Sequence, residues 1–129
     1  MTVVVAYLPT PAGEAAFAAG LAESNRRSEP LLVLNSPHTG APISKTVADE
    51  PTLARLRERA AEHHIELDLR LDGHTDDLVD LLLTIADEVN ASVIVIGLRH
   101  RTAVGKLLMG SNAQRILLQT KRPVLAVKA

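Results

Sequence analysis

Residues 92–97 read Ser-Val-Ile-Val-Ile-Gly, a continuous apolar run with mostly β-branched side chains that ends at a glycine. Such a run is typical of a strand that is buried on both faces of a sheet. Just before it, apolar residues recur at helical intervals from Leu78 to Val89, which predicts an amphipathic helix with Thr75 as its N-cap. A helix that leads into a buried strand is the repeating unit of a parallel α/β sheet.

Further strands follow the same reasoning along the chain. Continuous apolar runs predict buried strands at residues 3–7, 31–34 and 124–127. Residues 65–71 alternate strictly between apolar and polar side chains, so we expect this strand to lie at an edge of the sheet. The sequence therefore predicts five strands, four of them largely buried.

Three more helices are expected, around residues 13–27, over residues 49–64 and from Ser111 onward. Ser111 and Gln114 match a capping box, which predicts Ser111 as an N-cap, and Pro123 ends this helix. Strands and helices thus alternate from the first element to the last. This order predicts a single α/β domain over residues 1–129, with one doubly wound parallel sheet and helices on both of its faces.

The composition excludes several classes of protein. The chain has no cysteine, which rules out a disulfide scaffold, thiol catalysis and a cysteine-ligated metal. Its apolar runs are too short to span a membrane, and the N-terminus lacks the features of a leader peptide, so a cytoplasmic protein is expected. An aromatic content of 2% and a pI of about 6.5 argue against a nucleic-acid partner.

Charge is distributed unevenly between the two parts of the chain. Residues 97–129 carry seven basic and no acidic residues, whereas the first 96 residues have a net charge of −8. This asymmetry favours an anionic ligand or a second chain at the basic tail. The alternative is that the tail pairs with the acidic part of its own fold.

In doubly wound sheets, ligands bind at the carboxyl ends of the strands, where the winding reverses. The segments after Tyr7, Asn35 and Ile96 are therefore the candidates for a binding site. The connection over residues 35–48 is unusually long, a length typical of lids and of disordered segments.

The segment after Ile96 carries the strongest chemical signal. Gly97 closes a buried strand, and Gly110 and Ser111 open a helix. A helix N-terminus attracts anions, and a glycine beside it lets a phosphate approach the backbone. Arg99, Arg101 and Lys106 would add positive charge. The alternative is that Gly97 only turns the chain and Ser111 only caps the helix.

These residues resemble the universal stress proteins of the UspA family, and the resemblance covers essentially the whole chain. It is carried by Val3–Tyr7, Val93–Gly97, Val104–Ser111 and Arg122–Lys128. Nucleotide-binding members have Gly, two residues, Gly, nine residues, then Gly and Ser or Thr, and this spacing is kept here. The resemblance implies a Rossmann-like fold, similar to the adenine nucleotide alpha hydrolases, with strand order 3-2-1-4-5.

The resemblance also implies an adenine nucleotide as ligand, with ATP and Mg²⁺ as the expected pair. The expected phosphate-binding residues are Gly97, Arg99, His100, Lys106, Gly110, Ser111 and Asn112, and the expected nucleoside pocket is Tyr7, Leu8, Pro9 and Val33. Two positions depart from the family pattern. His100 replaces the second glycine of the motif, and Leu8 takes the place of an aspartate after the first strand.

The first hypothesis is therefore a stress-response regulator that binds ATP and changes its partners with occupancy. A second hypothesis is a nucleotide-independent homodimeric interaction protein with a degenerate pocket, which Leu8 and His100 favour. A weak hydrolase ranks last, because no general base is evident and the Gly-x-Ser-x-Gly motif is missing. A dedicated enzyme is not expected.

Two further expectations concern metals and the oligomeric state. No metal site is expected, because His63 and His64 are adjacent on a helix and point in different directions, and the other histidines are isolated. The apolar last strand, Pro123 to Val127, ends the sheet, so we expect a homodimer that pairs through it. The resemblance implies the same dimer.

Overall fold

The computed structural model describes residues 1–35, 49–71, 77–98 and 110–129. Its strands are β1 (Thr2–Ala6), β2 (Leu31–Leu34), β3 (Leu67–Arg70), β4 (Ala91–Leu98) and β5 (Val124–Lys128). Its helices are α1 (Pro11–Arg27), α3 (Glu50–Glu62), α4 (Leu78–Glu88) and α5 (Ser111–Gln119). The predicted alternation of strands and helices is confirmed.

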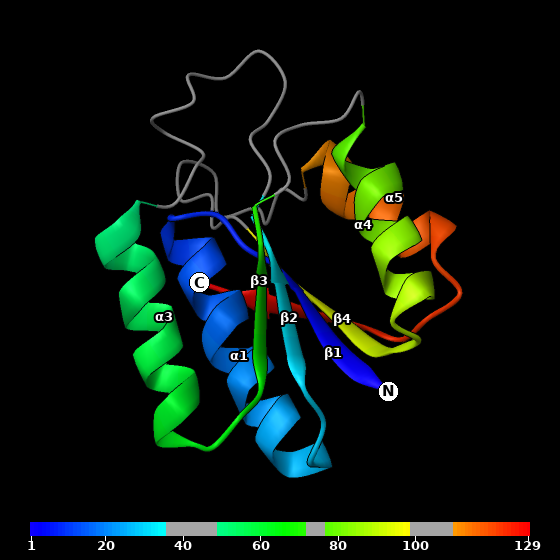
Figure 1. The fold of residues 1–129 in the computed structure, drawn as a ribbon. Helices are drawn as coiled ribbons and strands as arrows, with labels where there is room; N and C mark the ends of the chain where they lie inside the picture. The colour runs from blue at the N-terminus through cyan, green and yellow to red at the C-terminus, as the bar shows by residue number, and fades with distance from the viewer. Residues whose placement is uncertain (36–48, 72–76, 99–109) are drawn as a thin grey trace.

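The five strands form one parallel sheet in the order β3-β2-β1-β4-β5. Figure 1 shows α1 and α3 on one side of this sheet and α4 and α5 on the other. The predicted fold class and strand order are therefore confirmed. Strand β3, the alternating one, lies at an edge as expected, and the winding reverses between β1 and β4.

The core has two halves because successive strand residues point to opposite faces of the sheet. Val3, Val5 and Val33 pack beneath α1 and α3, together with Phe17 and Leu56. On the other face, the core beneath α4 and α5 contains Val4, Leu32, Leu34, Val79, Leu82, Ile94, Ile96 and Ile116. Strand β1 contributes to both halves, and its three valines are fully buried.

Two predicted helix starts were wrong. The N-cap of α4 is Asp77, whose Oδ1 accepts from the backbone N–H groups of Val79 at 2.9 Å and Asp80 at 3.3 Å. Thr75, the predicted cap, lies outside the described residues. The N-cap of α5 is Gly110, which has extended backbone (φ −65°, ψ 159°), and the helix has no side-chain cap. Ser111 is already helical, so the capping box predicted for it does not form.

Several strand and helix limits also differ from the prediction: β1 starts and ends one residue earlier than predicted, and α3 is shorter at both ends. Strand β3 starts at Leu67, two residues later than predicted, and ends at Arg70. Helix α1 begins at Pro11, earlier than predicted, because the Oγ1 of Thr10 accepts from the N–H of Gly13 at 3.1 Å and caps it. Within the described ranges, no helix is both long enough and apolar enough to cross a membrane.

Candidate functional site

A cavity of about 880 Å³ lies where the winding of the sheet reverses. The carboxyl ends of β1 and β4 contribute residues 6–8 and 96–98 to its lining. The starts of three helices complete it, with residues 10–13 from the start of α1, Leu78, Val79 and Leu82 from α4, and residues 110–113 from the start of α5. Ligands of α/β sheets bind at this position, so the cavity is the candidate site.

The wall formed by α1 is closely packed against the strand ends. A Cβ atom added at Gly97 would lie 2.0 Å from the backbone oxygen of Ala12, and one added at Gly13 would lie 1.7 Å from that of Leu8. Both distances are far below van der Waals contact. Gly97 is therefore required by the close approach of α1 to β4, a packing reason that the sequence alone did not reveal.

Tyr7 borders the cavity, but its ring belongs to the core. The ring is buried and packs edge-on against Phe17, with 6.3 Å between the ring centroids. Its backbone N–H donates to the oxygen of Leu34 at 2.9 Å, and the Nδ2 of Asn35 donates to its carbonyl at 3.0 Å. The end of β1 is therefore held firmly in place.

The hydroxyl of Tyr7 connects this strand end to two helices. It donates to Oε1 of Glu14 at 2.6 Å, and the guanidinium of Arg55 in α3 donates to both oxygens of Glu14, at 2.6 and 3.1 Å. Burial and the neighbouring Glu14 raise the pKa of Tyr7 to about 12. The hydrogen bonds from Arg55 lower the pKa of Glu14, which keeps that carboxylate ionised.

The start of α5 differs from that of α1 because it is open. Gly110 is exposed, and no atom of the described residues lies within 4 Å of a Cβ atom built on it. The first turn of α5 contains no acidic residue and receives no side-chain cap. The first N–H groups of a helix have no partner within it and carry partial positive charge. An anion can therefore reach this helix end from the cavity.

Helix α5 is linked to α4 by an ion pair beside the cavity. Arg115 contacts Oδ1 of Asp77 through Nη1 at 3.0 Å and Oδ2 through Nη2 at 2.8 Å. Oδ1 of Asp80 lies 3.7 Å from the same Nη2. The hydrogen bonds from Arg115 lower the pKa of Asp77. The carboxylate of Asp77 thus caps α4 and binds α5 at the same time.

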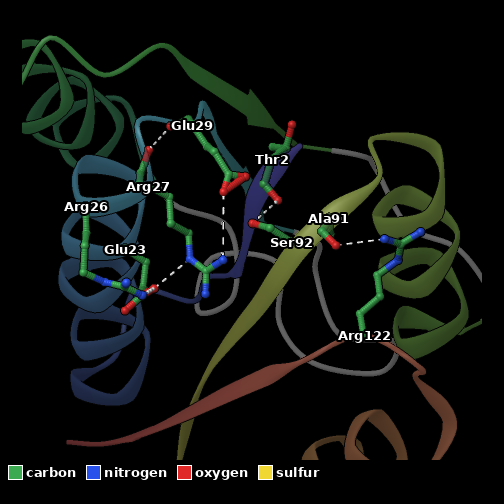
Figure 2. A network of polar contacts seen from close by, with 9 residues as sticks. Thr2, Glu23, Arg26, Arg27, Glu29, Ala91, Ser92 and Arg122 are labelled. Carbon is green, nitrogen blue, oxygen red and sulfur yellow. Dashed lines mark hydrogen bonds and ion pairs between the residues drawn. The ribbon is translucent and has the colours of Figure 1, made fainter.

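Some basic residues of the tail pair with acidic residues of the same fold, as the alternative explanation of the uneven charge predicted. Besides Arg115, Arg122 contacts Oδ1 of Asp87 at 3.0 Å. Figure 2 shows the side chain of Arg122 reaching the carbonyl oxygen of Ala91, which accepts at 2.8 Å. These two arginines therefore connect the tail to α4 and to the start of β4.

The structure brings some of the predicted site residues together and not others. Those that line the cavity are Tyr7, Leu8, Gly97, Gly110, Ser111 and Asn112. Pro9 is exposed and does not line it, and Val33 is buried on the opposite face of the sheet, under α1 and α3. Arg99, Arg101, His100, Lys106 and the segment over residues 36–48 lie outside the described residues.

Sequence reasoning missed the contribution of α4 and of the start of α1. Leu78, Val79 and Leu82 form an apolar wall of the cavity. The predicted stripe contained Leu78 and Leu82 and indicated their burial without saying against what, whereas Val79, which is fully buried, was not part of it. Leu34 lines the cavity in place of its neighbour Val33, because adjacent strand residues face opposite ways.

The described histidines lie far from this site. His63 and His64 follow α3 and line a second cavity of about 350 Å³, formed with the end of α1. In the part of the chain that the structure describes, no group of three or more His, Asp or Glu residues could hold a metal ion.

Comparisons with known proteins agree on one family. The family model described as "Universal stress protein family" matches residues 1–128. A protein of Mycolicibacterium smegmatis named "Universal stress protein" is 40% identical over 134 residues, covering 98% of this chain and 96% of its own.

Solved structures give the same result. A universal stress protein from Archaeoglobus fulgidus superposes with a TM-score of 0.80 at 28% identity, over 99% of this chain and 98% of its own. A structure of a universal stress protein from the same organism in complex with dAMP has a TM-score of 0.74 at 24% identity, over 99% and 98%. The fold of the chain is thus the fold of these proteins.

Proposed function

Because the chain belongs to the universal stress protein family, we propose that it is a stress-response regulator that binds an adenine nucleotide. The proposed ligand is ATP with Mg²⁺, and its phosphates lie at the start of α5. One observation carries this proposal: among the residues that the structure describes, none caps the N-terminus of α5 with a side chain and none lies within 4 Å of a Cβ atom built on Gly110, which borders a large cavity.

The electrostatics of the cavity favour a phosphate at this end. The free N–H groups of α5 and its dipole attract negative charge, and the segment before it supplies Arg99, Arg101 and Lys106. Gly110, Ser111 and Asn112 provide the backbone donors, and His100 adds a side-chain donor to the phosphates. Mg²⁺ commonly binds through phosphate oxygens and water, so it needs no dedicated cage of side chains here.

The size and lining of the cavity favour a nucleotide. About 880 Å³ lies within the roughly 300–1,000 Å³ of small-molecule and cofactor sites. Leu34, Leu78 and Val79 provide apolar surface against which a base can pack, and Tyr7 and Leu8 continue the lining beyond the end of β1. The relative from Archaeoglobus fulgidus in complex with dAMP supports an adenine base. Pro9 and Val33 have no part in this arrangement.

In this proposal the protein works by binding, as a cytoplasmic homodimer, and not as a dedicated enzyme. The dimer forms through β5, which lies at the edge of the sheet. The apolar residues Val124, Leu125 and Val127 of β5 are only partly buried in the single chain. Light scattering at micromolar concentration is expected to give about twice the chain mass of 13.8 kDa, whereas a mass of one chain would contradict the dimer.

A second candidate function is a homodimeric interaction protein that needs no nucleotide. One observation favours it: the wall after β1 presents Leu8, an apolar side chain, to the cavity. A nucleoside that loses one polar contact binds about 5- to 150-fold more weakly. The two candidates share the fold and the dimer and differ only in whether the cavity binds a nucleotide.

Calorimetric titration of the nucleotide-stripped protein with ATP and Mg²⁺ distinguishes them. We expect micromolar binding by the wild type and at least roughly 100-fold weaker binding by Gly110→Asp, because its carboxylate would repel the phosphates. Gln119→Asp is the matched control, since it adds the same charge at the other end of α5. It should bind ATP as the wild type does.

Two results would count against the proposal. Folded wild-type protein that releases no heat up to millimolar ATP would favour the nucleotide-independent candidate. Equal affinities of the wild type and Gly110→Asp would show that ATP binds somewhere other than the start of α5.

A further inference from the structure

Few side chains hold α5 in place. The helix is nine residues long, and Ile116 is its only buried residue. Leu117 and Leu118 are 38% and 84% exposed and contribute little to the core. Since short helices in proteins depend on tertiary contacts for their stability, the polar contacts of α5 decide where its first turn lies.

A polar contact of this kind starts from the middle residue of the helix. Arg115, four residues after Ser111, meets both carboxylate oxygens of Asp77, at 3.0 and 2.8 Å. Asp77 is fixed in turn, because its Oδ1 accepts from the N–H groups of Val79 and Asp80 at the start of α4. Two parallel hydrogen bonds from a guanidinium define its direction as well as its distance.

The segment after α5 has its own attachment. Arg122 binds Asp87 and Asn90 at the end of α4, at 3.0 and 3.2 Å, and the carbonyl of Ala91 at 2.8 Å. The close-up in Figure 2 shows this contact at the start of β4. Arg122 therefore fixes the end of α5 to α4, whereas Arg115 fixes its beginning.

We propose that Arg115 and Asp77 are positioning residues for the phosphate end of the cavity. Their ion pair holds the first turn of α5 so that the N–H groups of residues 111–113 converge on one point. The inference rests on the proposed function, because that point is where the nucleotide phosphates lie. Neither side chain touches the ligand in this arrangement, and both act through the backbone of α5.

A comparison of ATP with adenosine tests the proposal. Arg115→Gln and Asp77→Asn each remove the ion pair, and asparagine at position 77 still caps α4. We expect each variant to bind ATP about fivefold more weakly than the wild type, the size of a partly exposed ion pair. Adenosine lacks phosphates, so its affinity should change less than about twofold.

Arg122→Gln is the matched control. It removes an arginine that also binds an aspartate of α4, but at the far end of α5. We expect it to lower the thermal stability and to leave the ratio of the ATP and adenosine affinities unchanged. The double variant Asp77→Asn/Arg115→Gln should bind ATP no more weakly than either single variant, since both remove one interaction.

Three results would overturn the proposal. An unchanged ATP affinity in Arg115→Gln would show that the pair positions nothing, and an equal loss for adenosine would show a general effect on packing. Tighter ATP binding by Asp77→Asn would mean that Asp77 keeps the charge of Arg115 away from the phosphates.

Amide hydrogen exchange provides a readout that needs no nucleotide. The N–H of Gln114 donates to the oxygen of Gly110 at 3.1 Å and closes the first turn of α5. We expect this proton to exchange faster in Arg115→Gln than in the wild type, and at the wild-type rate in Arg122→Gln. A failure of ATP to bind would refute the proposed function. Separately, an unchanged exchange rate of the Gln114 N–H in Arg115→Gln would refute the positioning role of the ion pair.

Discussion

Of the three helices that begin at the cavity, α1 and α5 have N-termini that are built in opposite ways. The start of α1 is closed by its own chain: Thr10 caps it, Pro11 has no N–H to offer, and Glu14 adds negative charge in its first turn. The start of α5 has glycine as N-cap, no side-chain cap and no acid. A helix dipole attracts anions at both positions, but within the described part of the chain the start of α5 leaves its donors accessible and the start of α1 does not.

Gly97 and Gly110, the two glycines that match the nucleotide-binding motif, differ as the two helix starts do: one is closely packed and the other is open. Gly97 lies under α1, where a Cβ atom would meet the oxygen of Ala12 at 2.0 Å. A Cβ atom on Gly110 would meet no atom of the described residues within 4 Å. One glycine therefore serves the packing of the fold, and the other leaves space at the cavity. A motif that looks uniform in sequence thus combines two physical roles.

Alanine substitutions at Gly97 and Gly110 should differ most in their effect on the free energy of unfolding. Gly97→Ala forces backbone atoms of α1 and β4 apart, so we expect the free energy of unfolding to fall by about 3 kcal/mol or more. Gly110→Ala has room and an ordinary extended backbone, and should cost less than about 1 kcal/mol. Chemical denaturation measures both, and equal losses would contradict the separation of roles.

The alkaline titration of Tyr7 tests how well the packing of α1 against the end of β1 excludes water from the Tyr7 ring. Burial and Glu14 raise its pKa to about 12 from an ordinary value of 10, so the protonated phenol is favoured by folding. This stabilisation is fully present below pH 10 and is lost between pH 10 and about 12. Tyr7 is the only tyrosine and there is no tryptophan, so tyrosinate absorbance follows it directly.

Glu14→Gln supplies the control for this titration. It keeps an oxygen near the hydroxyl of Tyr7 and removes the negative charge, so the midpoint should move down toward 10. A wild-type midpoint near 10 would mean that the ring is more open to water than the structure shows.

Substitutions at Thr10 and Gly110, the N-caps of α1 and α5, should change the free energy of unfolding least, and in opposite directions. Thr10→Ala removes the hydrogen bond to the N–H of Gly13, and should lower the free energy of unfolding by about 1 kcal/mol. Gly110→Asp adds a cap and a negative charge to α5, and should raise it by about 0.5 kcal/mol without nucleotide. Destabilisation by both, measured by thermal unfolding, would contradict an uncapped α5.

The sequence predicted the sheet well because its signals are local. Continuous apolar runs marked the buried strands β1, β2 and β4, and the alternation around Leu67 placed β3 at the edge. The prediction that the strand at residues 124–127 is buried was wrong, because β5 lies at the other edge and has no buried residue. Helix starts were harder to predict: Thr75 and Asp77 are both good caps, and Ser111 matched a capping pattern although Gly110 holds the capping position. Only the course of the backbone in space decides between such neighbours.

The candidate site was predicted in part, for a related reason. Gly110, Ser111 and Leu8 reach the cavity because they follow directly from strand ends or open a helix. Val33 does not, because a strand that is apolar on both faces gives no sign of which face borders a ligand. Residue Leu34 pairs with Ala6 in the sheet and faces the cavity. That choice depends on the register of β1 and β2, which composition does not fix.

The central claim is that an anion binds at the start of α5 and not at that of α1. Backbone amide chemical shifts of ¹⁵N-labelled protein, followed during titration with ATP and Mg²⁺, test it most directly. The account predicts that the largest changes occur at Gly110, Ser111 and Asn112, with small changes at Gly13 and Glu14. The largest changes at Gly13 and Glu14, or none at either helix, would contradict it.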